Sequence, residues 1–353
     1  MMKIKKTAKC DRNRPEMHYL CPQAVRQRDG LEFVVCKLLH VSFNYKAMMK
    51  NTLPSRILVV GANGFTGRYL LRALAGKESC QVTGLSLHPD ILPASGYYRF
   101  VEMDMTRPEA LSQVFEEIRP DCVVNTAALS APDYCELHRE EADRLNVQAV
   151  AALADNCNRY GSRLIHLSTD FVFGGTSRRL YTEEDIPSPV NYYGHTKLES
   201  ERVVADLCTC YAIARIVVVY GNAFPGQHGN IVQLVAGRLR KGETVKVVSD
   251  QWRTPTFVED VAGGVERLIT HPANGIYHLC GGECVSIAEL AYRVADVLHL
   301  DRSLILPVTT EEMQEKTPRP CFSGLSIEKA RCELGYCPHS LEDGIRKMYT
   351  STV

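Results

Sequence analysis

What this sequence lacks excludes several classes of protein. Lysine and arginine together number 41, as do aspartate and glutamate, so no net charge draws the chain to nucleic acid or to an anionic membrane. No apolar run approaches the roughly 20 residues of a membrane-spanning helix. The 14 cysteines contain no C-x-x-C pair, which argues against a zinc knuckle and a disulfide framework. We therefore expect reduced, mostly buried thiols in a cytoplasmic protein.

Residues 1–54 differ from the rest of the chain. They are basic, show no clear periodicity and lack the uninterrupted hydrophobic core of a secretory signal. Two interpretations stay open: an atypical disordered extension, or a segment upstream of a true start at Met48 or Met49.

From Arg56 onward, apolar runs alternate with helical patterns. This alternation predicts an α/β fold with a doubly wound, Rossmann-like parallel sheet, whose ligand lies outside the carboxyl ends of the strands. We expect strands at 57–60, 81–85, 98–102, 121–125, 163–167 and 212–219, and helices at 69–75, 109–118, 140–160 and 191–205.

The regular alternation of predicted strands and helices changes after Tyr220-Gly221. Helices are expected at 230–240, 258–270 and 286–298, with strands at 244–248 and 275–279. We expect a smaller, mainly C-terminal α/β lobe that binds the substrate. The predicted division is a nucleotide-binding domain at 55–221, to which 243–272 returns, and a substrate lobe at 222–353.

A glycine run marks the predicted nucleotide site. Gly61, Gly64 and Gly67 follow a strand and open a helix, the context that lets backbone N–H groups approach a pyrophosphate. The alternative is a glycine-rich turn without a ligand. The residues expected to contact the dinucleotide here are Gly61, Asn63, Gly64, Phe65, Thr66 and Gly67.

The ends of the next two strands bear on the choice of dinucleotide. The second strand ends in Ser86-Leu87-His88, without an acid for a ribose 2′-hydroxyl. This favours NADP(H), although NAD(H) could also be used. Ser86, His88 and Arg68 are candidates to contact a 2′-phosphate. Asp104, after the third strand, suits either the adenine amino group or the capping of a helix.

A reactive set follows the fifth strand. Tyr193 and Lys197 are four residues apart on a predicted helix, so they share one face. An adjacent ammonium lowers the pKa of a phenol, and the Thr169 hydroxyl can donate to a ketone oxygen as charge builds there. This set suits the transfer of a hydride and a proton to a ketone. Tyr192 is a competing phenol without the four-residue offset.

These motifs resemble the extended short-chain dehydrogenase/reductases, and within them the dTDP-4-dehydrorhamnose reductase family, over Arg56 to Tyr349. The resemblance implies that Thr169, Tyr193 and Lys197 are catalytic, that Asn146 supports the active site, and that Ala127 and Ala128 line the nicotinamide side of the groove. The matching segments are 123–128, 145–147, 168–174, 193–199 and 319–325.

The chain departs from the family at two positions of the nucleotide site. Ala62 stands where the family often has threonine. Tyr69 stands where some relatives carry a glutamate tied to a magnesium site, so we expect no metal.

The substrate side is expected around the only tryptophan. In the resemblance, Asp170 and Trp252 face the sugar nucleotide, and Arg253 or Arg319 meets its diphosphate. The alternative is that this loop only packs in the small lobe. The implied activity is the NAD(P)H-dependent reduction of the C4 ketone of a nucleotide-linked deoxysugar, dTDP-4-dehydro-L-rhamnose to dTDP-L-rhamnose.

Two other functions stay open. One is another extended-family epimerase or dehydratase of sugar nucleotides. The other is a non-catalytic, NADP-binding regulatory subunit, because the resemblance also covers the beta subunit of methionine adenosyltransferase. The expected partner is a small-molecule sugar nucleotide, with neither nucleic acid nor membrane, and a homodimer is left open.

Overall fold

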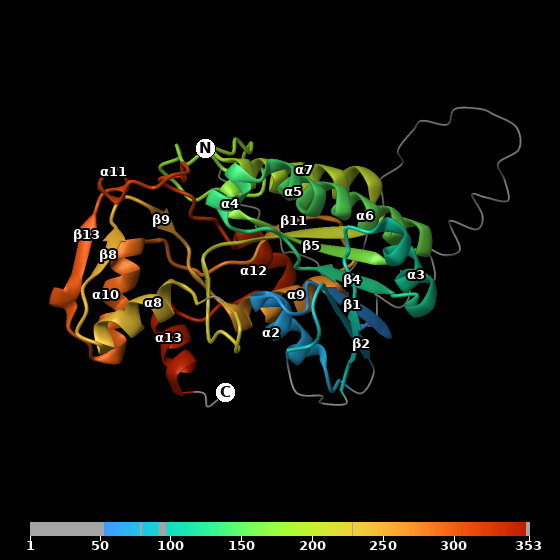
Figure 1. Ribbon diagram of the computed structural model, residues 1–353, viewed down its shortest axis with the longest axis horizontal. Helices are drawn as coiled ribbons and strands as arrows, with labels where there is room; N and C mark the ends of the chain where they lie inside the picture. The colour runs from blue at the N-terminus through green and yellow to red at the C-terminus, as the bar shows by residue number, and fades with distance from the viewer. Residues whose placement is uncertain (1–52, 78–79, 92–96, 228, 351–353) are drawn as a thin grey trace, which may run out of the picture. The chain divides into compact units, whose positions relative to one another are not determined.

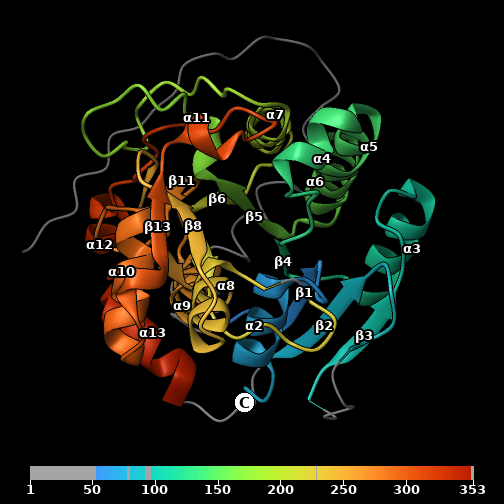
Figure 2. The same ribbon diagram turned by 60° about the vertical axis from the view of Figure 1, so that its left-hand side comes forward.

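A parallel sheet of seven strands organises the described part of the chain. The computed structural model describes residues 53–77, 80–91, 97–227 and 229–350. The strand order is β11-β6-β5-β4-β1-β2-β3 (Figure 2), with every pairing parallel. The strands are β1 (Arg56–Val60), β2 (Gln81–Ser86), β3 (Arg99–Glu102), β4 (Cys122–Asn125), β5 (Arg163–Thr169), β6 (Tyr211–Ile216) and β11 (Gly275–His278).

The chain winds in two directions from the middle of this sheet. It runs from β1 outward through β2 to β3, and then from β4 outward through β5 and β6 to β11. The direction changes between β1 and β4, and a ligand crevice forms at such a switch point. The doubly wound fold expected from the sequence is confirmed.

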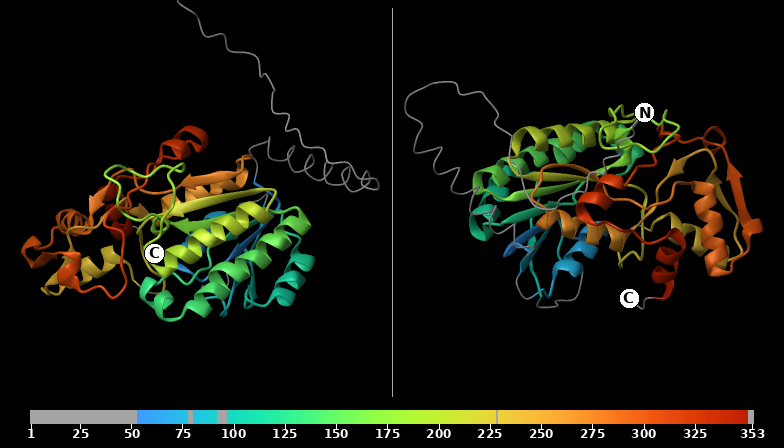
Figure 3. Two further views of the ribbon diagram at one scale, coloured as in Figure 1. Left: turned by 90° about the horizontal axis from the view of Figure 1, so that it is seen from above. Right: turned by 180° about the vertical axis from the view of Figure 1, so that it is seen from behind.

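Helices cover both faces of the sheet (Figure 1). One layer lies across the strands in the view from above (Figure 3, left). It contains α3 (Pro108–Ile118), α4 (Pro132–Leu137), α5 (Arg139–Asp143), η1 (Arg144–Gln148), α6 (Ala149–Tyr160) and α7 (Tyr192–Leu207). The opposite layer contains α2 (Phe65–Leu74), α9 (Val258–Thr270) and α12 (Glu328–Leu334).

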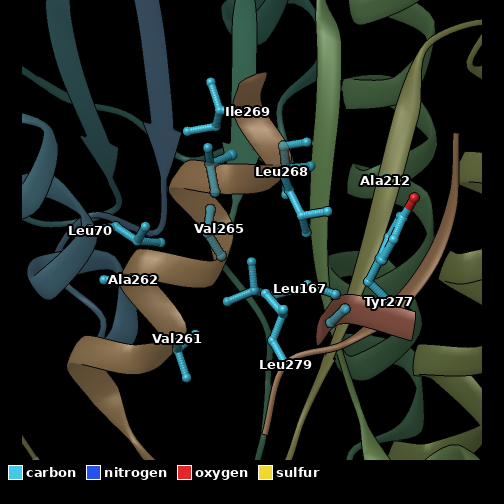
Figure 4. Packing of buried hydrophobic residues seen from close by; sticks show 14 of the residues in the cluster. Leu70, Leu167, Ala212, Val261, Ala262, Val265, Leu268, Ile269, Tyr277 and Leu279 are labelled. Atoms are coloured by element: carbon cyan, nitrogen blue, oxygen red, sulfur yellow. The ribbon is translucent and has the colours of Figure 1, made fainter. Parts of the chain in front are cut away.

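Alternation along the buried strands fills both interfaces. In β1, Ile57 and Val59 join the core under α2 and α9, whereas Leu58 and Val60 join the core under α3 and α6. Figure 4 shows Val261, Val265 and Leu268 of α9 packed toward strand residues such as Leu167. This two-sided burial is why Ile57 to Val60 of β1 are all apolar.

A second hydrophobic cluster builds the smaller lobe. Its paired strands are β8 (Val245–Val248) with β13 (Ile305–Val308), β7 (Val219–Tyr220) with β10 (Thr256–Phe257), and β9 (Trp252–Arg253) with β12 (Val285–Ser286). Its helices are α8 (Ile231–Arg240), α10 (Ile287–Leu298), η3 (Arg302–Leu304), α11 (Thr310–Met313) and α13 (Leu341–Thr350).

The sequence predicted that the segment 243–272 returns to the large sheet. The elements that do so only partly coincide with it. Within that segment β8 pairs with β13, while α9 packs against β5 and β6. Beyond it, β11 pairs with β6 and completes the sheet. The returning elements are therefore α9, β11 and α12.

Three local boundaries also differ from expectation. The helix expected at 140–160 is divided into α5, the π-helical η1 and α6. The strand expected at 212–219 stops at Ile216, because Val218 has a left-handed φ of 36° that turns the chain into β7. The helix expected from Tyr69 starts at Phe65, directly after its N-cap Gly64.

The described cysteines are all free. Five are buried, three are partly buried and three are exposed. Among the described helices, none combines the length and apolarity that a membrane crossing requires.

Gly67 tests how tightly α2 packs against the first turn. A Cβ there would lie 2.2 Å from the Gly61 carbonyl oxygen. Gly67→Ala should therefore lower the free energy of unfolding by about 1–3 kcal/mol, measured by urea denaturation. The control is Gly237→Ala in α8, where a Cβ meets open space and should add about 0.5–1 kcal/mol. Equal stability of the Gly67 variant and the wild type would contradict this packing.

Candidate active site

The glycine run forms an open cradle at the start of α2. Gly61 has a left-handed φ of 79°, and its N–H donates to the Leu85 carbonyl at 2.9 Å. Gly64 donates to the Gly61 carbonyl at 2.8 Å and is the N-cap of α2. Because glycine offers no capping side chain, the first-turn N–H groups of Phe65, Thr66 and Gly67 remain for an anionic ligand.

The loop after β2 folds back onto this cradle. Asn63 Nδ2 donates to the carbonyls of His88 (2.9 Å) and Pro89 (2.8 Å). The guanidinium of Arg68 is fully buried, pairs with Asp90 at 2.7 Å and donates to Asn63. Arg68 is thus committed inside the protein rather than turned toward a phosphate. Asp90 escaped the sequence analysis because it lies four residues beyond the end of β2.

Ser86 and Asp104 lie at neighbouring strand ends. Ser86 is half-buried, and its carbonyl accepts from Met103 N–H at 2.8 Å. Asp104 Oδ1 accepts from the N–H (2.9 Å) and hydroxyl (2.8 Å) of Thr106. These bonds make Asp104 part of a local turn before α3. This role is closer to the expected helix cap than to the expected contact with adenine.

A loop from the small lobe also reaches the cradle. Gln227 Nε2 donates to the Asn63 carbonyl at 2.8 Å, and the Tyr69 hydroxyl donates to the Asn222 carbonyl at 3.0 Å. The sequence analysis did not select Gln227, because a glutamine in a Gly- and Pro-containing loop carries no motif. Tyr69 places a phenol at the position of the metal-linked glutamate.

The end of β4 forms the wall beside the cradle. Asn125 Oδ1 accepts from Ala127 N–H at 3.1 Å, which fixes the backbone leading to Ala128. Gly61 approaches this segment so closely that a Cβ on it would lie 2.6 Å from Ala127 N. Ala127 and Ala128 are both partly exposed.

The end of β5 carries a hydroxyl and a buried carboxylate. Thr169 Oγ1 donates to Asp170 Oδ1 at 3.1 Å and accepts from Phe171 N–H at 3.2 Å, starting η2 (Asp170–Val172). Ser323 donates to the other carboxylate oxygen of Asp170, and Arg253 Nε lies 3.6 Å from it. Burial raises the pKa of Asp170, and Arg253 and Ser323 oppose that rise.

A close contact sets α7 against this strand end. Asn191 caps α7 by accepting from Gly194 N–H at 2.8 Å. A Cβ on Gly194 would lie 2.2 Å from the Phe171 carbonyl oxygen, so glycine is required for the approach. The result is that Tyr193 lies beside Thr169, with the Tyr193 ring edge-on to Phe171 at 5.9 Å between centroids.

The pKa of Tyr193 differs from the sequence expectation. Burial raises it above the ordinary value of 10.0, the hydrogen bond with Thr169 opposes the rise, and Asp170 adds to it. The expected lowering by Lys197 is wrong for the protein alone, because Lys197 Nζ donates to the Leu167 carbonyl at 2.7 Å and lies against His166 at 3.1 Å. Burial lowers the pKa of Lys197 to about 8, opposed by Glu201.

Asn146 connects α7 to the loop after β4. Its Oδ1 accepts from Leu129 N–H at 2.8 Å, and its Nδ2 donates to the Leu129 carbonyl (3.0 Å) and to Thr196 Oγ1 (2.9 Å). It lies in the π-helical turn η1, a distortion that is frequent at functional sites. These contacts tie Thr196 of α7 to the backbone of Leu129.

The substrate-side residues are not equivalent. Trp252 is 41% exposed, whereas Arg253 is 2% exposed and also donates to the carbonyl of Trp252 and to Gln251. Arg253 therefore neutralises Asp170 instead of presenting itself to solvent. Arg319 remains 31% exposed, paired with Glu315 at 2.9 Å and near Asp133 at 3.6 Å. Ser323, which the sequence analysis did not assign, completes the Asp170 cluster.

Comparisons with known proteins identify relatives of this chain. The family described as RmlD substrate binding domain matches residues 55–353. The chain is 32% identical over 288 residues to dTDP-4-keto-6-deoxy-D-glucose reductase of Streptomyces niveus, covering 81% of this chain and 93% of the relative. It is 32% identical over 284 residues to methionine adenosyltransferase 2 subunit beta of Xenopus tropicalis, covering 79% and 82%.

A solved structure shares the fold. dTDP-4-dehydrorhamnose reductase from Bacillus anthracis, in complex with NADP, superposes with a TM-score of 0.76 at 27% identity, covering 85% of this chain and 100% of that one.

Arg253 tests the buried charge at the site. Arg253→Met leaves the Asp170 carboxylate without its cation, which should cost about 3–5 kcal/mol of unfolding free energy at neutral pH. Since the loss comes from an ionised carboxylate whose pKa is already raised, the deficit should shrink as the pH falls toward the ordinary value of 3.8. Urea denaturation at several pH values measures it.

Arg319→Met is the matched control, because its partly exposed ion pairs contribute at most about 1 kcal/mol. A deficit that is equal for both variants, or constant with pH, would contradict the assigned pairing.

Proposed function

Because the chain belongs to the RmlD substrate binding domain family, we propose that it is an NAD(P)H-dependent oxidoreductase acting on sugar nucleotides. It reduces the C4 ketone of a nucleotide-linked deoxysugar, dTDP-4-dehydro-L-rhamnose to dTDP-L-rhamnose. The observation that carries the proposal is the placement of Tyr193 beside Thr169 at the carboxyl end of β5, with the buried Lys197 amine one helical turn along. The reductase from Streptomyces niveus supports the substrate class.

The glycine cradle fits a dinucleotide. A Cβ at Gly61 would collide with the backbone of Ala127, and one at Gly67 with the Gly61 carbonyl, so glycine is needed for the shape of this turn. The uncapped start of α2 favours a pyrophosphate. NADP(H) is favoured and NAD(H) can be used, and the NADP complex of the Bacillus anthracis reductase supports this order. When bound, the reduced dinucleotide supplies the hydride.

The chain itself handles the proton and the developing charge. Burial keeps the Tyr193 phenol protonated, so it is ready to donate its proton to the oxygen on C4. Thr169 turns its single hydroxyl proton from Asp170 to the same oxygen when the substrate is bound. Lys197 holds the cofactor ribose and stabilises the phenolate that remains. Asn146 keeps α7 in register with the loop after β4.

The substrate lies between the strand ends and the small lobe. Trp252 covers the deoxysugar, and the partly exposed Arg319 meets the diphosphate. Asp170 orients the Thr169 hydroxyl, whose proton it accepts until the substrate is bound. The partner is thus a small molecule, with neither nucleic acid nor membrane involved, and the proposal includes a homodimer. The free cysteines support a reducing cytoplasm.

A panel of dTDP- and GDP-linked 4-keto sugars tests this function through the absorbance of NADPH and NADH. Stoichiometric loss of NADPH with a 4-keto sugar supports it. An epimerase or dehydratase would transform the sugar without net consumption of NADPH. The second candidate, a regulatory subunit, is favoured by the Xenopus tropicalis relative. It predicts NADPH binding without turnover and a co-purifying partner enzyme.

Tyr193→Phe removes the proton donor. Turnover should fall by about 100-fold or more, with the dissociation constant of NADPH little changed. The matched control is Tyr192→Phe, because the Tyr192 hydroxyl donates to Asp143 at 2.7 Å on the outer side of α7. That variant should retain turnover close to the wild type. Full activity of the Tyr193 variant would exclude the mechanism.

The pH dependence of kcat/KM reports the free enzyme. Lys197 carries its ammonium below its pKa of about 8 and loses it above. We therefore expect kcat/KM to fall as the pH rises through about 8. A profile that stays level up to the ordinary lysine value of 10.5 would show that the charge on Lys197 is not needed.

A further inference from the structure

A buried polar layer lies between α7 and the sheet, directly beneath the site. Asn125 of β4 and His166 of β5 face Lys197 and Ser200 of α7. None of the four is more than 2% exposed. An apolar interface would cost less free energy at this place, since each buried polar group needs a hydrogen-bond partner.

Asn125 determines which nitrogen of His166 carries the proton. Its Oδ1 accepts from Ala127 N–H at 3.1 Å, so the group facing His166 is the Nδ2 amide. That amide lies 3.1 Å from His166 Nδ1, which must therefore accept. Burial and the nearby Lys197 lower the pKa of His166 well below its ordinary value, so the ring is neutral. A neutral ring that accepts at Nδ1 carries its proton on Nε2.

The Nε2 proton has a partner of its own. Ser200 Oγ lies 3.0 Å from His166 Nε2 and donates its own proton to the Lys197 carbonyl at 2.7 Å. Ser200 therefore accepts from Nε2–H. Lys197 Nζ is 3.1 Å from the same nitrogen but finds an N–H there and no lone pair. Its acceptor among the described residues is the Leu167 carbonyl at 2.7 Å.

We propose that Asn125 and His166 are positioning residues for Lys197. By holding the imidazole as its Nε2–H tautomer, Asn125 denies the Lys197 ammonium a second acceptor inside the protein. The remaining N–H groups of Lys197 are then left for the cofactor ribose, a step that rests on the proposed function. The same arrangement makes Lys197 easier to deprotonate than burial alone would.

The other charged groups near Lys197 are already paired. Glu201 of α7 forms a buried ion pair with Arg215 of β6, with bonds of 2.9 and 2.7 Å. Asp170 of η2 is held by Arg253 and Ser323. Tyr193 faces Thr169. None of these groups contacts the edge of His166 that meets Lys197, so the tautomer is an independent influence on the amine.

The first experiment measures the tautomer in the intact, ¹⁵N-labelled protein by long-range ¹H–¹⁵N correlation. The His166 signals are assigned by their loss in His166→Gln. We expect the Nε2–H pattern, unchanged on both sides of the Lys197 pKa of about 8. An Nδ1–H pattern, or an imidazolium, would overturn the proposal. This result does not depend on any sugar substrate, so it stands apart from the proposed function.

The second experiment reverses the tautomer with Asn125→Asp. A carboxylate keeps the acceptor for Ala127 N–H but accepts from Nδ1–H, which frees the Nε2 lone pair for the Lys197 ammonium. The pH at which NADPH binding weakens should rise by about one unit, a ten-fold change in proton affinity. It is measured from the NADPH dissociation constant across pH, with the tautomer recorded on the same sample.

The added negative charge requires a control. Asn125→Asp combined with His166→Gln is compared with His166→Gln alone. The proposal requires the upward shift to disappear in this pair and the tautomer and the binding pH to change together. A shift of equal size without His166, or a reversed tautomer without a shift, would overturn it.

Discussion

The approach of α7 to the carboxyl end of β5 is the constraint on which the site depends. Gly194 allows the helix to touch the Phe171 carbonyl, and the Asn191 cap fixes where the helix begins. Tyr193 and Lys197 then fall on either side of the strand end, one beside Thr169 and the other on the Leu167 carbonyl. A shift of the helix by even one residue would separate all of these pairs, because their order comes from one helical register.

This close approach places polar groups where a core would otherwise be apolar. Asp170, His166, Lys197 and the Arg215–Glu201 pair are all buried near one strand end. Each is stabilised by a specific partner and not by solvent, so the layer adds little net stability and much orientation. The hydrophobic clusters above and below the sheet supply the stability that this layer does not.

The large sheet could be predicted because its signals are local. Runs such as Ile57–Val60 are apolar without alternation, and glycines punctuate them at the turns. The smaller lobe was harder to predict, because β9, β10 and β12 are only two residues long. Such short strands are defined by pairing with another strand and not by a pattern in their own sequence. The break in β6 depends on the single backbone angle of Val218, which no composition reveals.

The candidate site shows the same division. The spacing of the motifs was enough to predict Thr169, Tyr193 and Lys197 as one set, and the structure brings them to one strand end. The sign of the Tyr193 pKa shift could not be predicted, because it depends on burial and on Asp170 rather than on the distance along the helix. Arg253 and Arg68 were both candidates to bind a phosphate. Their ion-pair partners, Asp170 and Asp90, are known only from the folded chain.

The bond from Gln227 to Asn63 joins the two lobes at the mouth of the cradle. A single neutral hydrogen bond contributes about 0.5–1.5 kcal/mol, so this bond adds little to the stability of the protein. Asn63 also donates to the carbonyls of His88 and Pro89. This one residue of the glycine run is therefore hydrogen-bonded both to the loop after β2 and to the loop that contains Gln227. Two segments that are far apart in the sequence thus meet at a single residue of the glycine run, each through a hydrogen bond.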